Sequence, residues 1–307
     1  MKRSSLISCQ ALKQALLDKK PSTLGTASGS VIKVLDGSWH MPIMNRNGYK
    51  EYLNEHIPTA LFFDIDGLSD PTTDLPHMLP SVKMFEESIT EMGIVNTDHV
   101  VVYDTAFTSA FRVWFTFKVF GHKGDVSLLD GGLTKWKLLG YPVESGQPKP
   151  EKRDQPYKAN FQEQYIVKLD DIVNNLNSKK AYIVDARSAE RFNGIQPEPR
   201  PNLKSGHIPN SFNIPFPTLV NPEDKTFKSH AEILKLFQNS GLSIKEVDGK
   251  VVIDRPIIGS CGSGVTACAL LYSLNLLGIE LDQLRLYDGS FSEYGKVSFE
   301  HPVHQRK

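Results

Sequence analysis

Short apolar runs rich in β-branched residues alternate along the chain with longer stretches whose apolar residues recur every three or four positions. The short runs at 31–36, 100–104, 182–185 and 256–260 predict buried strands. The longer stretches at 81–93, 230–241 and 265–278 predict helices. Such alternation is typical of a mostly parallel sheet with helices on both faces. We therefore predict an α/β fold in which ligands bind beyond the carboxyl ends of the strands.

The same series of local phrases occurs twice. In the first half a strand ends at Asp36, HIP follows at 56–58, a strand ends in YD at Asp104, and LLDGG begins at 128. In the second half the matching phrases are a strand ending at Asp185, HIP at 207–209, Cys261 after a strand, and LYDGS from 286. Most matching intervals differ by only one or two positions, which indicates duplication of a domain of about 130 residues.

The duplication predicts two tandem domains of the same α/β fold, at residues 5–143 and 164–300. Residues 144–163 are predicted to be a linker, because the segment 141–160 has four prolines, many charges and no apolar period. The first domain is expected to open with a helix whose apolar stripe consists of Leu6, Ala11, Leu12, Leu16 and Leu17. Since no acidic residue precedes Asp18, a mitochondrial presequence is the alternative.

Composition narrows the range of functions. The chain of 307 residues has 35 basic and 35 acidic side chains, so we expect no direct binding of nucleic acid. It lacks a run of 18 apolar residues, which argues against a membrane protein. Three cysteines are too few for a disulfide framework and suit a reducing, cytoplasmic setting. Without a GxGxxG after a strand, a Walker loop or paired histidines, we expect no cofactor and no metal.

Cys261 stands in the loop CGSGVT, between a predicted strand and a helix that starts near Val265. Backbone N–H groups of such a loop, here those of Gly262, Gly264, Val265 and Thr266, converge on one anion, and the helix N-terminus adds positive potential. A thiolate is therefore favoured.

The other positions of comparable interest are predicted to be inert. The first half has Asp104 at the position of Cys261, followed by TAFTSA, so it is expected to lack both a nucleophile and an anion-binding loop. Cys9 and Cys268 fall in predicted helices and are interpreted as structural.

Seven phrases stand out along the chain: FFDID at 62–66, PHMLP at 76–80, DARSAERF at 185–192, QPEPR at 196–200, SGHIP at 205–209, CGSGVTAC at 261–268 and YDGS at 287–290. Together they resemble the 3-mercaptopyruvate and thiosulfate sulfurtransferase (rhodanese) family, which implies that the two predicted domains are tandem rhodanese-like domains. Phe291 and Tyr294 stand where relatives have tryptophans.

The resemblance implies that Cys261 takes sulfur from 3-mercaptopyruvate and becomes a persulfide. It also implies that Arg191 and Arg200 hold the carboxylate and keto group of the donor. Asp66, His77 and Ser263 would transfer the proton. Thiosulfate should be a weaker donor, since thiosulfate-preferring relatives have basic residues where this chain has Gly262 and Ser263.

The resemblance further implies thiol acceptors such as thioredoxin or a sulfur-carrier protein, the latter as in fungal members linked to transfer RNA thiolation. Two other functions are alternatives to sulfur-transfer catalysis. A non-enzymatic persulfide relay would use the same cysteine. A cysteine phosphatase of the same fold would need an arginine at position 267, where this chain has Ala267, so phosphate would lack its guanidinium clamp.

Overall fold

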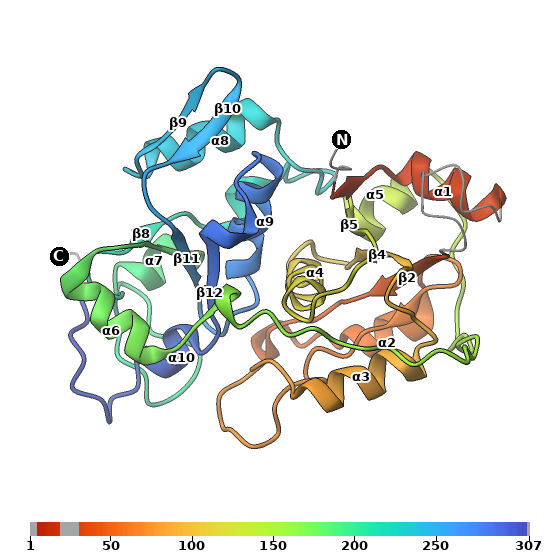
Figure 1. The fold of residues 1–307 in the computed structure, drawn as a ribbon, viewed down its shortest axis with the longest axis horizontal. Helices are drawn as coiled ribbons and strands as arrows, with labels where there is room; N and C mark the ends of the chain where they lie inside the picture. The colour runs from red at the N-terminus through yellow and green to blue at the C-terminus, as the bar shows by residue number, and fades with distance from the viewer. Residues whose placement is uncertain (1–4, 19–30, 306–307) are drawn as a thin grey trace. The chain divides into compact units, whose positions relative to one another are not determined.

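The computed structural model describes residues 5–18 and 31–305, which form two compact units. The first unit contains the described residues up to Asp70, together with 79–162 and 221–227. The second contains 71–78, 163–220 and the chain from Lys228 onward (Figure 1). Each unit therefore includes one short segment, Pro71–Met78 or Asn221–Phe227, that lies far in sequence from the rest of it.

The first unit is built on a sheet of five parallel strands in the order β1-β5-β4-β2-β3. Its central strand is buried over its whole length, because helices cover both faces of the sheet. The strands are β1 (Leu6–Ile7), β2 (Ile32–Asp36), β3 (Leu61–Phe62), β4 (His99–Tyr103) and β5 (Val126–Leu129).

Helices pack on both faces of this first sheet. They are α1 (Cys9–Asp18), α2 (Gly48–Asn54), α3 (Val82–Glu91), α4 (Ala110–Val119) and α5 (Gly132–Leu138), with a 3₁₀ turn η2 at Pro42–Met44. On one face, Leu12 of α1 and Trp136 of α5 belong to the same core cluster as Val101 of β4. The opposite face is covered by α4 and α3, whose Phe85 stacks on Phe120 directly after α4.

The predicted N-terminal stripe is only partly correct. Leu12 is fully buried, and Ala11 and Leu16 pack against the core as predicted. The prediction for Leu6 is wrong, because Leu6 lies in β1, where it pairs with Leu128, and not in the helix. Leu17 is also wrong, since its side chain is 66% exposed. Of the basic residues on which a presequence would depend, those at 2, 3, 19 and 20 lie outside the described residues, whereas Lys13 lies over the ring of Tyr141.

The second unit repeats the sheet of the first, with five parallel strands in the order β6-β12-β11-β7-β8. An antiparallel hairpin, β9-β10, forms a separate two-stranded sheet in the same unit. The strands are β6 (Ile166–Val167), β7 (Tyr182–Asp185), β8 (Phe212–Asn213), β9 (Ile244–Val247), β10 (Lys250–Ile253), β11 (Ile257–Ser260) and β12 (Leu284–Tyr287).

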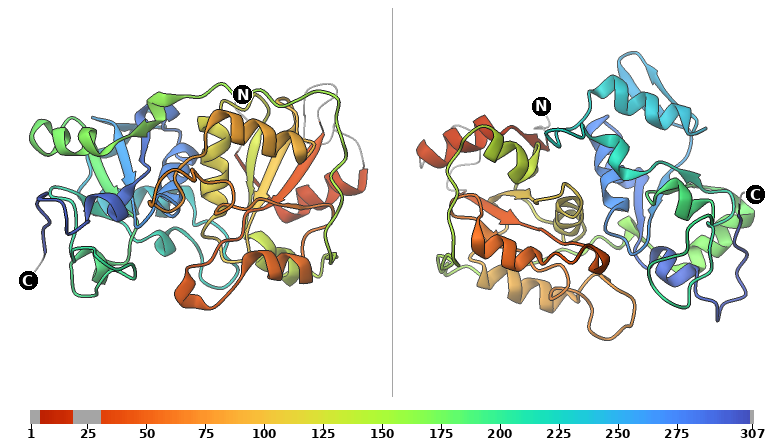
Figure 2. Two further views of the ribbon diagram at one scale, coloured as in Figure 1. Left: turned by 90° about the horizontal axis from the view of Figure 1, so that it is seen from below. Right: turned by 180° about the vertical axis from the view of Figure 1, so that it is seen from behind.

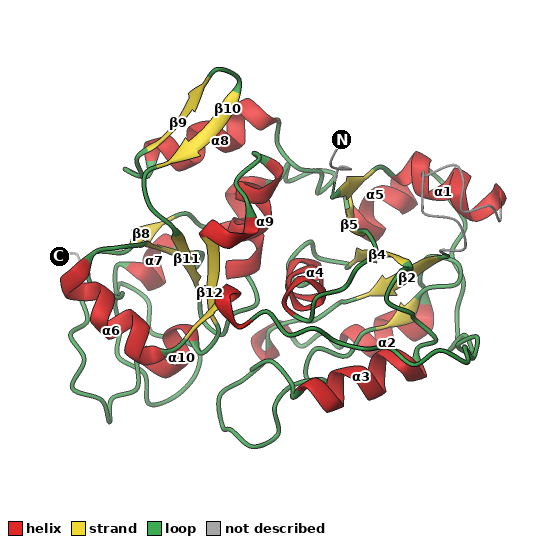
Figure 3. Cartoon of the chain, in the orientation of Figure 1, coloured by secondary structure: helices red, strands yellow, loops and turns green. Residues whose placement is uncertain are grey.

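Figures 2 and 3 show the second sheet between its helices. They are α6 (Leu169–Ser178), α7 (Ala189–Phe192), α8 (His230–Asn239), α9 (Ala267–Leu276) and α10 (Ser290–Tyr294), with 3₁₀ turns at Glu163–Tyr165, Phe216–Leu219 and Leu281–Gln283. Ile172 of α6 and Phe291 of α10 share a core cluster with Ile258 of β11. The apolar helix α9 is buried over most of its length and contacts β11 and β12.

Register establishes which positions of the two units correspond. Asp36 pairs with Tyr103 in the first sheet, and Asp185 pairs with Ser260 in the second. The next residues, Asp104 and Cys261, therefore occupy equivalent places at the carboxyl end of a central strand. The predicted fold class and the predicted duplication are both confirmed.

The HIP histidines occupy equivalent places as well. His56 and His207 are buried, and Nδ1 of each donates to a backbone carbonyl, that of Tyr52 at 2.8 Å and that of Phe192 at 2.7 Å. Each imidazole also stacks on the ring of the same residue. The phrase HIP thus marks a structural contact between a helix and the segment that leads to the next strand.

Candidate active site

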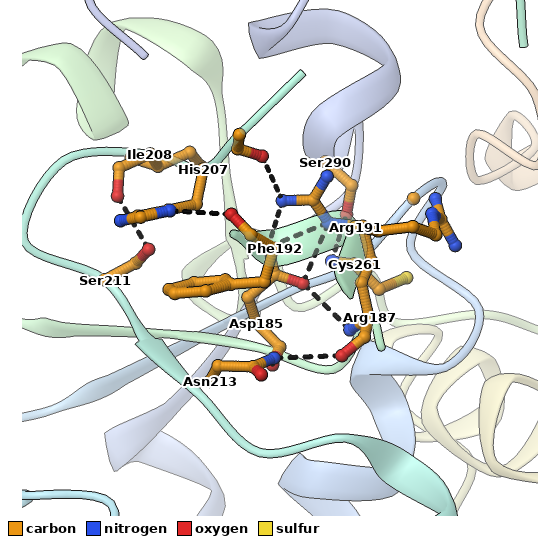
Figure 4. A network of polar contacts seen from close by, with 12 residues as sticks. Asp185, Arg187, Arg191, Phe192, His207, Ile208, Ser211, Asn213, Cys261 and Ser290 are labelled. Carbon is orange, nitrogen blue, oxygen red and sulfur yellow. Dashed lines mark hydrogen bonds and ion pairs between the residues drawn. The ribbon is translucent and has the colours of Figure 1, made fainter. Parts of the chain in front are cut away.

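Cys261 directly follows β11 and is only 2% exposed. Its backbone N–H donates to the hydroxyl of Ser290 at 3.2 Å, and its carbonyl accepts from the N–H of Phe291 at 3.0 Å. Ser290 begins α10, so the loop after β12 holds the cysteine in place (Figure 4). The prediction that Cys261 lies in a strand-to-helix loop is correct.

The loop from Gly262 to Thr266 is fixed by contacts at both ends. The carbonyl of Gly262 accepts from the backbone N–H of Ser292 at 2.9 Å and from its hydroxyl at 2.6 Å. Gly264 has a φ of +77°, a conformation that favours glycine. The thiol of Cys268 donates to the carbonyl of Gly264 at 3.2 Å, which gives this buried cysteine a structural role.

The corresponding loop of the first unit shows what such a loop can bind. The Asp104 carboxylate accepts five backbone N–H groups, those of Ala106, Phe107, Thr108, Ser109 and Ala110. The expectation that the first half has no anion-binding loop is therefore wrong: it has one, and its own carboxylate fills it. Glycine was not required, because Phe107 adopts a φ of +52° at the position that matches Gly264.

Ser263 is the meeting point of two predicted site residues. Nδ1 of His77 lies 2.9 Å from its hydroxyl oxygen, and Nη2 of Arg200 donates to the same oxygen at 3.4 Å. His77 lies in the segment Pro71–Met78, which belongs to the second unit together with Ser263. Asp66 belongs to the first unit, where its carboxylate accepts from the indole N–H of Trp39 at 3.0 Å. The structure thus joins His77, Arg200 and Ser263 within one unit.

Both predicted donor-binding arginines face Gly262. A Cβ atom at that position would lie 3.1 Å from Nη2 of Arg191 and 3.6 Å from Nη1 of Arg200. Glycine beside the nucleophile therefore leaves room for two guanidinium groups at the same point of the loop. The two cations can act together on an anion bound next to Cys261.

A buried ion network that the sequence reasoning missed holds Arg191. Glu198, with a side chain 2% exposed, accepts from Nη1 of Arg187 at 2.7 Å and from Nη2 of Arg191 at 2.5 Å. Arg187 also donates to Asp185 at 2.6 Å (Figure 4). Its guanidinium lies over the ring of Phe291. Glu198 stands inside the phrase QPEPR, but a carboxylate between prolines carries no sequence signal for burial.

Charges explain why this network persists in the protein interior. Burial favours the neutral form of Arg187, but the carboxylates of Asp185 and Glu198 outweigh it and raise the pKa of the guanidinium. In the first unit, Asp36 is equivalent to Asp185, and Ser38 stands at the position equivalent to Arg187. Without that cation, burial raises the pKa of Asp36 to about 7. The ion network is thus specific to the half that has the cysteine.

The remaining cysteine, Cys9, is buried at the start of α1, and its thiol donates to the carbonyl of Asp130 at 3.5 Å. Burial, together with the nearby charge of Asp130, raises the pKa of the Cys9 thiol to about 12. A thiol in this state is a poor nucleophile. Across residues 5–18 and 31–305, there is no cluster of side chains suited to a metal ion, and no helix is long and apolar enough to cross a membrane.

Together the fold and the site define a tandem α/β protein in which one half has a cysteine in an anion-binding loop beside arginines. The family model of the rhodanese-like domain matches residues 28–139 and 168–296. The chain therefore belongs to the rhodanese family, as the resemblance predicted.

Relatives extend over nearly the whole chain. It is 41% identical to the Arabidopsis thaliana protein "Thiosulfate/3-mercaptopyruvate sulfurtransferase 1, mitochondrial" over 86% of this chain and 71% of that protein. It is 38% identical to the rat 3-mercaptopyruvate sulfurtransferase, with 98% of this chain and 95% of the rat protein covered. The crystal structure of the Tum1 protein from Saccharomyces cerevisiae matches with a TM-score of 0.80 at 29% identity, covering 98% and 97% of the two chains. The chain is a sulfurtransferase, and the prediction of an enzyme is confirmed.

Proposed function

We propose that this enzyme takes sulfur from 3-mercaptopyruvate, with Cys261 as the nucleophile, and passes it to a thiol acceptor. The Cys261 thiolate attacks the donor sulfur, and the carbon–sulfur bond breaks with its electron pair going to the donor carbon. The proton of the donor thiol moves to that carbon, so that pyruvate leaves and Cys261 retains the sulfur as a persulfide. The observation that carries the proposal is the place of Cys261 within the anion-binding loop.

The filled loop of the first unit supports the role of the active loop. Five N–H groups surround the Asp104 carboxylate, and their counterparts belong to residues 263–267. By this correspondence Gly264, Val265 and Thr266 would stabilise the negative charge of the thiolate and of the persulfide through their backbone N–H groups. The proposal adds the N–H of Gly262, whose counterpart in the first unit, Thr105, donates to Ser38 instead of to Asp104. The helix α9 begins directly after it and adds positive potential.

The side chains around Ser263 support the proton transfer. The hydroxyl of Ser263 is within hydrogen-bonding distance of His77, so the pair can pass a proton to or from a donor beside Cys261. Arg191 and Arg200 would hold the carboxylate and keto group, since both guanidinium groups face Gly262. The third member of the proposed set, Asp66, would orient His77; this part of the proposal comes from the family resemblance.

Charge favours 3-mercaptopyruvate over thiosulfate as donor. The three guanidinium groups of Arg187, Arg191 and Arg200 are offset by the carboxylates of Asp185 and Glu198, which leaves a surplus of one positive charge among these side chains. The Cys261 thiolate balances that surplus, so each further negative charge on the donor is unfavourable, and thiosulfate carries one more than 3-mercaptopyruvate. Neither Gly262 nor Ser263 adds a cation.

The decisive test combines mass spectrometry with turnover. After exposure to 3-mercaptopyruvate, the protein should gain one sulfur atom on Cys261, and with excess thiol it should release pyruvate over many turnovers. Cys261→Ser should lose both, whereas Cys9→Ser and Cys268→Ser should keep most activity. A single round of pyruvate release would favour a non-enzymatic relay, and substantial turnover by Cys261→Ser would refute the mechanism.

The arginines have a separate test. Arg191→Ala and Arg200→Ala should each lower kcat/KM for 3-mercaptopyruvate by about 10- to 100-fold, because each removes a charge-assisted hydrogen bond worth about 1.5–3 kcal/mol. Far-ultraviolet circular dichroism should show that both variants are folded. Unaltered kinetic constants in both would remove these residues from the donor site.

Acceptors and location remain part of the proposal. We propose thioredoxin or a sulfur-carrier protein as physiological acceptor, with sulfur reaching transfer RNA thiolation by the second route and no direct contact with nucleic acid or membrane. The cytoplasm is the proposed compartment, with mitochondria as a second one, because a relative at 41% identity is described as mitochondrial. Fractionation of cells that produce the tagged protein tests the location.

A further inference from the structure

A cavity of the second unit, the one that contains Cys261, lies beside the loop of Cys261. It has a volume of about 560 Å³, and its walls include Asp74, Arg200, Leu203, Ser292 and Lys296. Cavities of this size accommodate small-molecule ligands. None of the functions proposed above requires the part of it that extends away from Arg200.

Two walls of this cavity contact the active loop directly, and a third adjoins a residue that does. Ser292 donates its hydroxyl to the carbonyl of Gly262 at 2.6 Å. Arg200 donates to the hydroxyl of Ser263, and Pro76, on another wall, precedes His77 in the chain. A ligand in the cavity would therefore lie beside the loop that carries Cys261.

The cavity is held open by a rigid frame of backbone contacts. Leu203 and Lys296 form an antiparallel bridge, and the N–H of Val297 donates to the carbonyl of Asn202 at 3.0 Å. Lys204 fixes the same frame, because its ammonium group donates to the carbonyls of two residues in the segment after Val297, Phe299 at 2.5 Å and His301 at 2.9 Å.

The charges of the cavity favour an anion. Nζ of Lys296 lies 3.2 Å and 3.1 Å from the two carboxylate oxygens of Asp74. The Asp74 side chain is 81% exposed, whereas that of Lys296 is 28% exposed. Such exposed ion pairs contribute little free energy, so an incoming carboxylate can replace Asp74 at Lys296 at small cost.

Access to the sulfur restricts the occupant further. Cys261 is 2% exposed, so an acceptor must reach it with a narrow extension, either a small molecule or a protruding segment of a carrier protein. A slender molecule can extend along the apolar walls formed by Leu75, Leu203 and Val297 and still place a carboxylate near Lys296. The occupant that fits both conditions is a peptide-sized thiol with a carboxylate several bonds from its sulfur.

We propose that this cavity is the acceptor subsite, in which Lys296 recognises a carboxylate of a small thiol acceptor. The inference rests on the proposed function. The acceptor thiol gives its proton to the outer sulfur of the Cys261 persulfide, and the resulting thiolate attacks that sulfur. The sulfur–sulfur bond of the enzyme breaks, the Cys261 thiolate leaves, and the acceptor departs as its own persulfide.

The test separates the two half-reactions. Glutathione, which carries two carboxylates, and its diethyl ester, which carries none, serve as acceptors of equal length for enzyme already loaded with sulfur. Loss of the persulfide is followed by mass spectrometry after rapid quenching. The donor half-reaction is measured separately, as the burst of pyruvate from 3-mercaptopyruvate without acceptor.

Lys296→Gln should raise the half-saturating concentration of glutathione about 3- to 10-fold, leaving the reaction with the diester and the pyruvate burst unchanged. Asp74→Asn should lower the half-saturating concentration of glutathione, since it removes a carboxylate that competes for Lys296. The control is Lys250→Gln, on the exposed strand β10, which should change nothing.

Equal glutathione constants in Lys296→Gln and the unaltered enzyme would overturn the inference, and so would an equal loss with the diester. A weaker pyruvate burst with unchanged acceptor constants would place Lys296 in donor binding and overturn it as well. Failure of the unaltered enzyme to form any persulfide would instead refute the proposed function itself.

Discussion

Replacing Glu198 with Gln removes one charge from the buried ion network and keeps the shape of the side chain. The carboxylate accepts hydrogen bonds from both Arg187 and Arg191, whereas the amide retains one acceptor oxygen and turns an NH2 group toward a guanidinium. Arg191 should therefore lose its fixed orientation beside the active loop. We expect lower activity with 3-mercaptopyruvate and a change in donor preference.

The magnitude follows from the charges. The substitution raises the local surplus of positive charge from one to two. At an effective dielectric constant of about 20 and a separation of about 8 Å, one added unit charge interacts with one unit charge of ligand by about 2 kcal/mol. Thiosulfate carries one more negative charge than 3-mercaptopyruvate, so the ratio of kcat/KM should shift toward thiosulfate by about 10-fold after screening by salt. Loss of a partner in a buried ion pair should also cost about 3–5 kcal/mol of stability.

The assay measures pyruvate release from 3-mercaptopyruvate and sulfite release from thiosulfate, at temperatures where urea unfolding shows the variant to be folded. Glu190→Gln is the matched control, because Glu190 is exposed on α7 next to Arg191 and undergoes the same chemical change. It should alter neither the donor ratio nor the stability.

A folded Glu198→Gln enzyme with the donor ratio of the unaltered protein would refute the electrostatic reasoning. A lower activity that affects both donors equally would show that Glu198 acts only through the orientation of Arg191. If Glu190→Gln gave the same shift, the effect would belong to the total charge of the protein instead of to this network.

Three further predictions concern the loops and the core. Gly262→Arg combined with Ser263→Lys should move the donor ratio toward thiosulfate by at least about 10-fold, measured as kcat/KM, because it adds cations beside the nucleophile; an unmoved ratio would exclude this loop from donor choice. Burial lowers the pKa of His122 from 6.5 to about 4. As the pH falls, this histidine therefore takes up a proton in the unfolded chain before it does so in the folded protein. The free energy of unfolding should thus drop by about 3 kcal/mol between pH 6.5 and pH 4. Urea unfolding at several pH values tests this, and His122→Gln should flatten the slope. Asp104→Ala should destabilise the protein by about 3 kcal/mol, and added sulfate should restore part of the melting temperature by filling the empty loop; a variant as stable as the unaltered protein would contradict this reading of the loop.

Much of the fold could be predicted from the sequence, because its signals are local. The β-branched run before Asp185 and the one before Cys261 end where the strands end, and the apolar stretch after Thr266 is the helix α9. The duplication was visible for the same reason, since its phrases lie at strand ends and turns.

The rest depends on contacts between distant residues or on backbone geometry. Phe107 takes a left-handed conformation without being glycine, so no residue type revealed the filled loop of the first unit. The burial of Glu198 arises from Arg187 and Arg191, and neither partner marks the other in sequence. Leu6 and Leu17 fit a helical period, yet pairing with β5 places the first in a strand, and the second remains in solvent.

The exchanged segments bear on how the chain folds as it is synthesised. Phe227 belongs to the first unit, where its ring packs on Phe107 and Phe111 and its N–H donates to Asp130. The ribosome must therefore synthesise much of the second unit before the first unit can complete its hydrophobic core. Because Pro71–Met78 waits in turn for the second unit, the two halves should reach their native states together, late in translation, and neither should be obtained intact by expressing it alone.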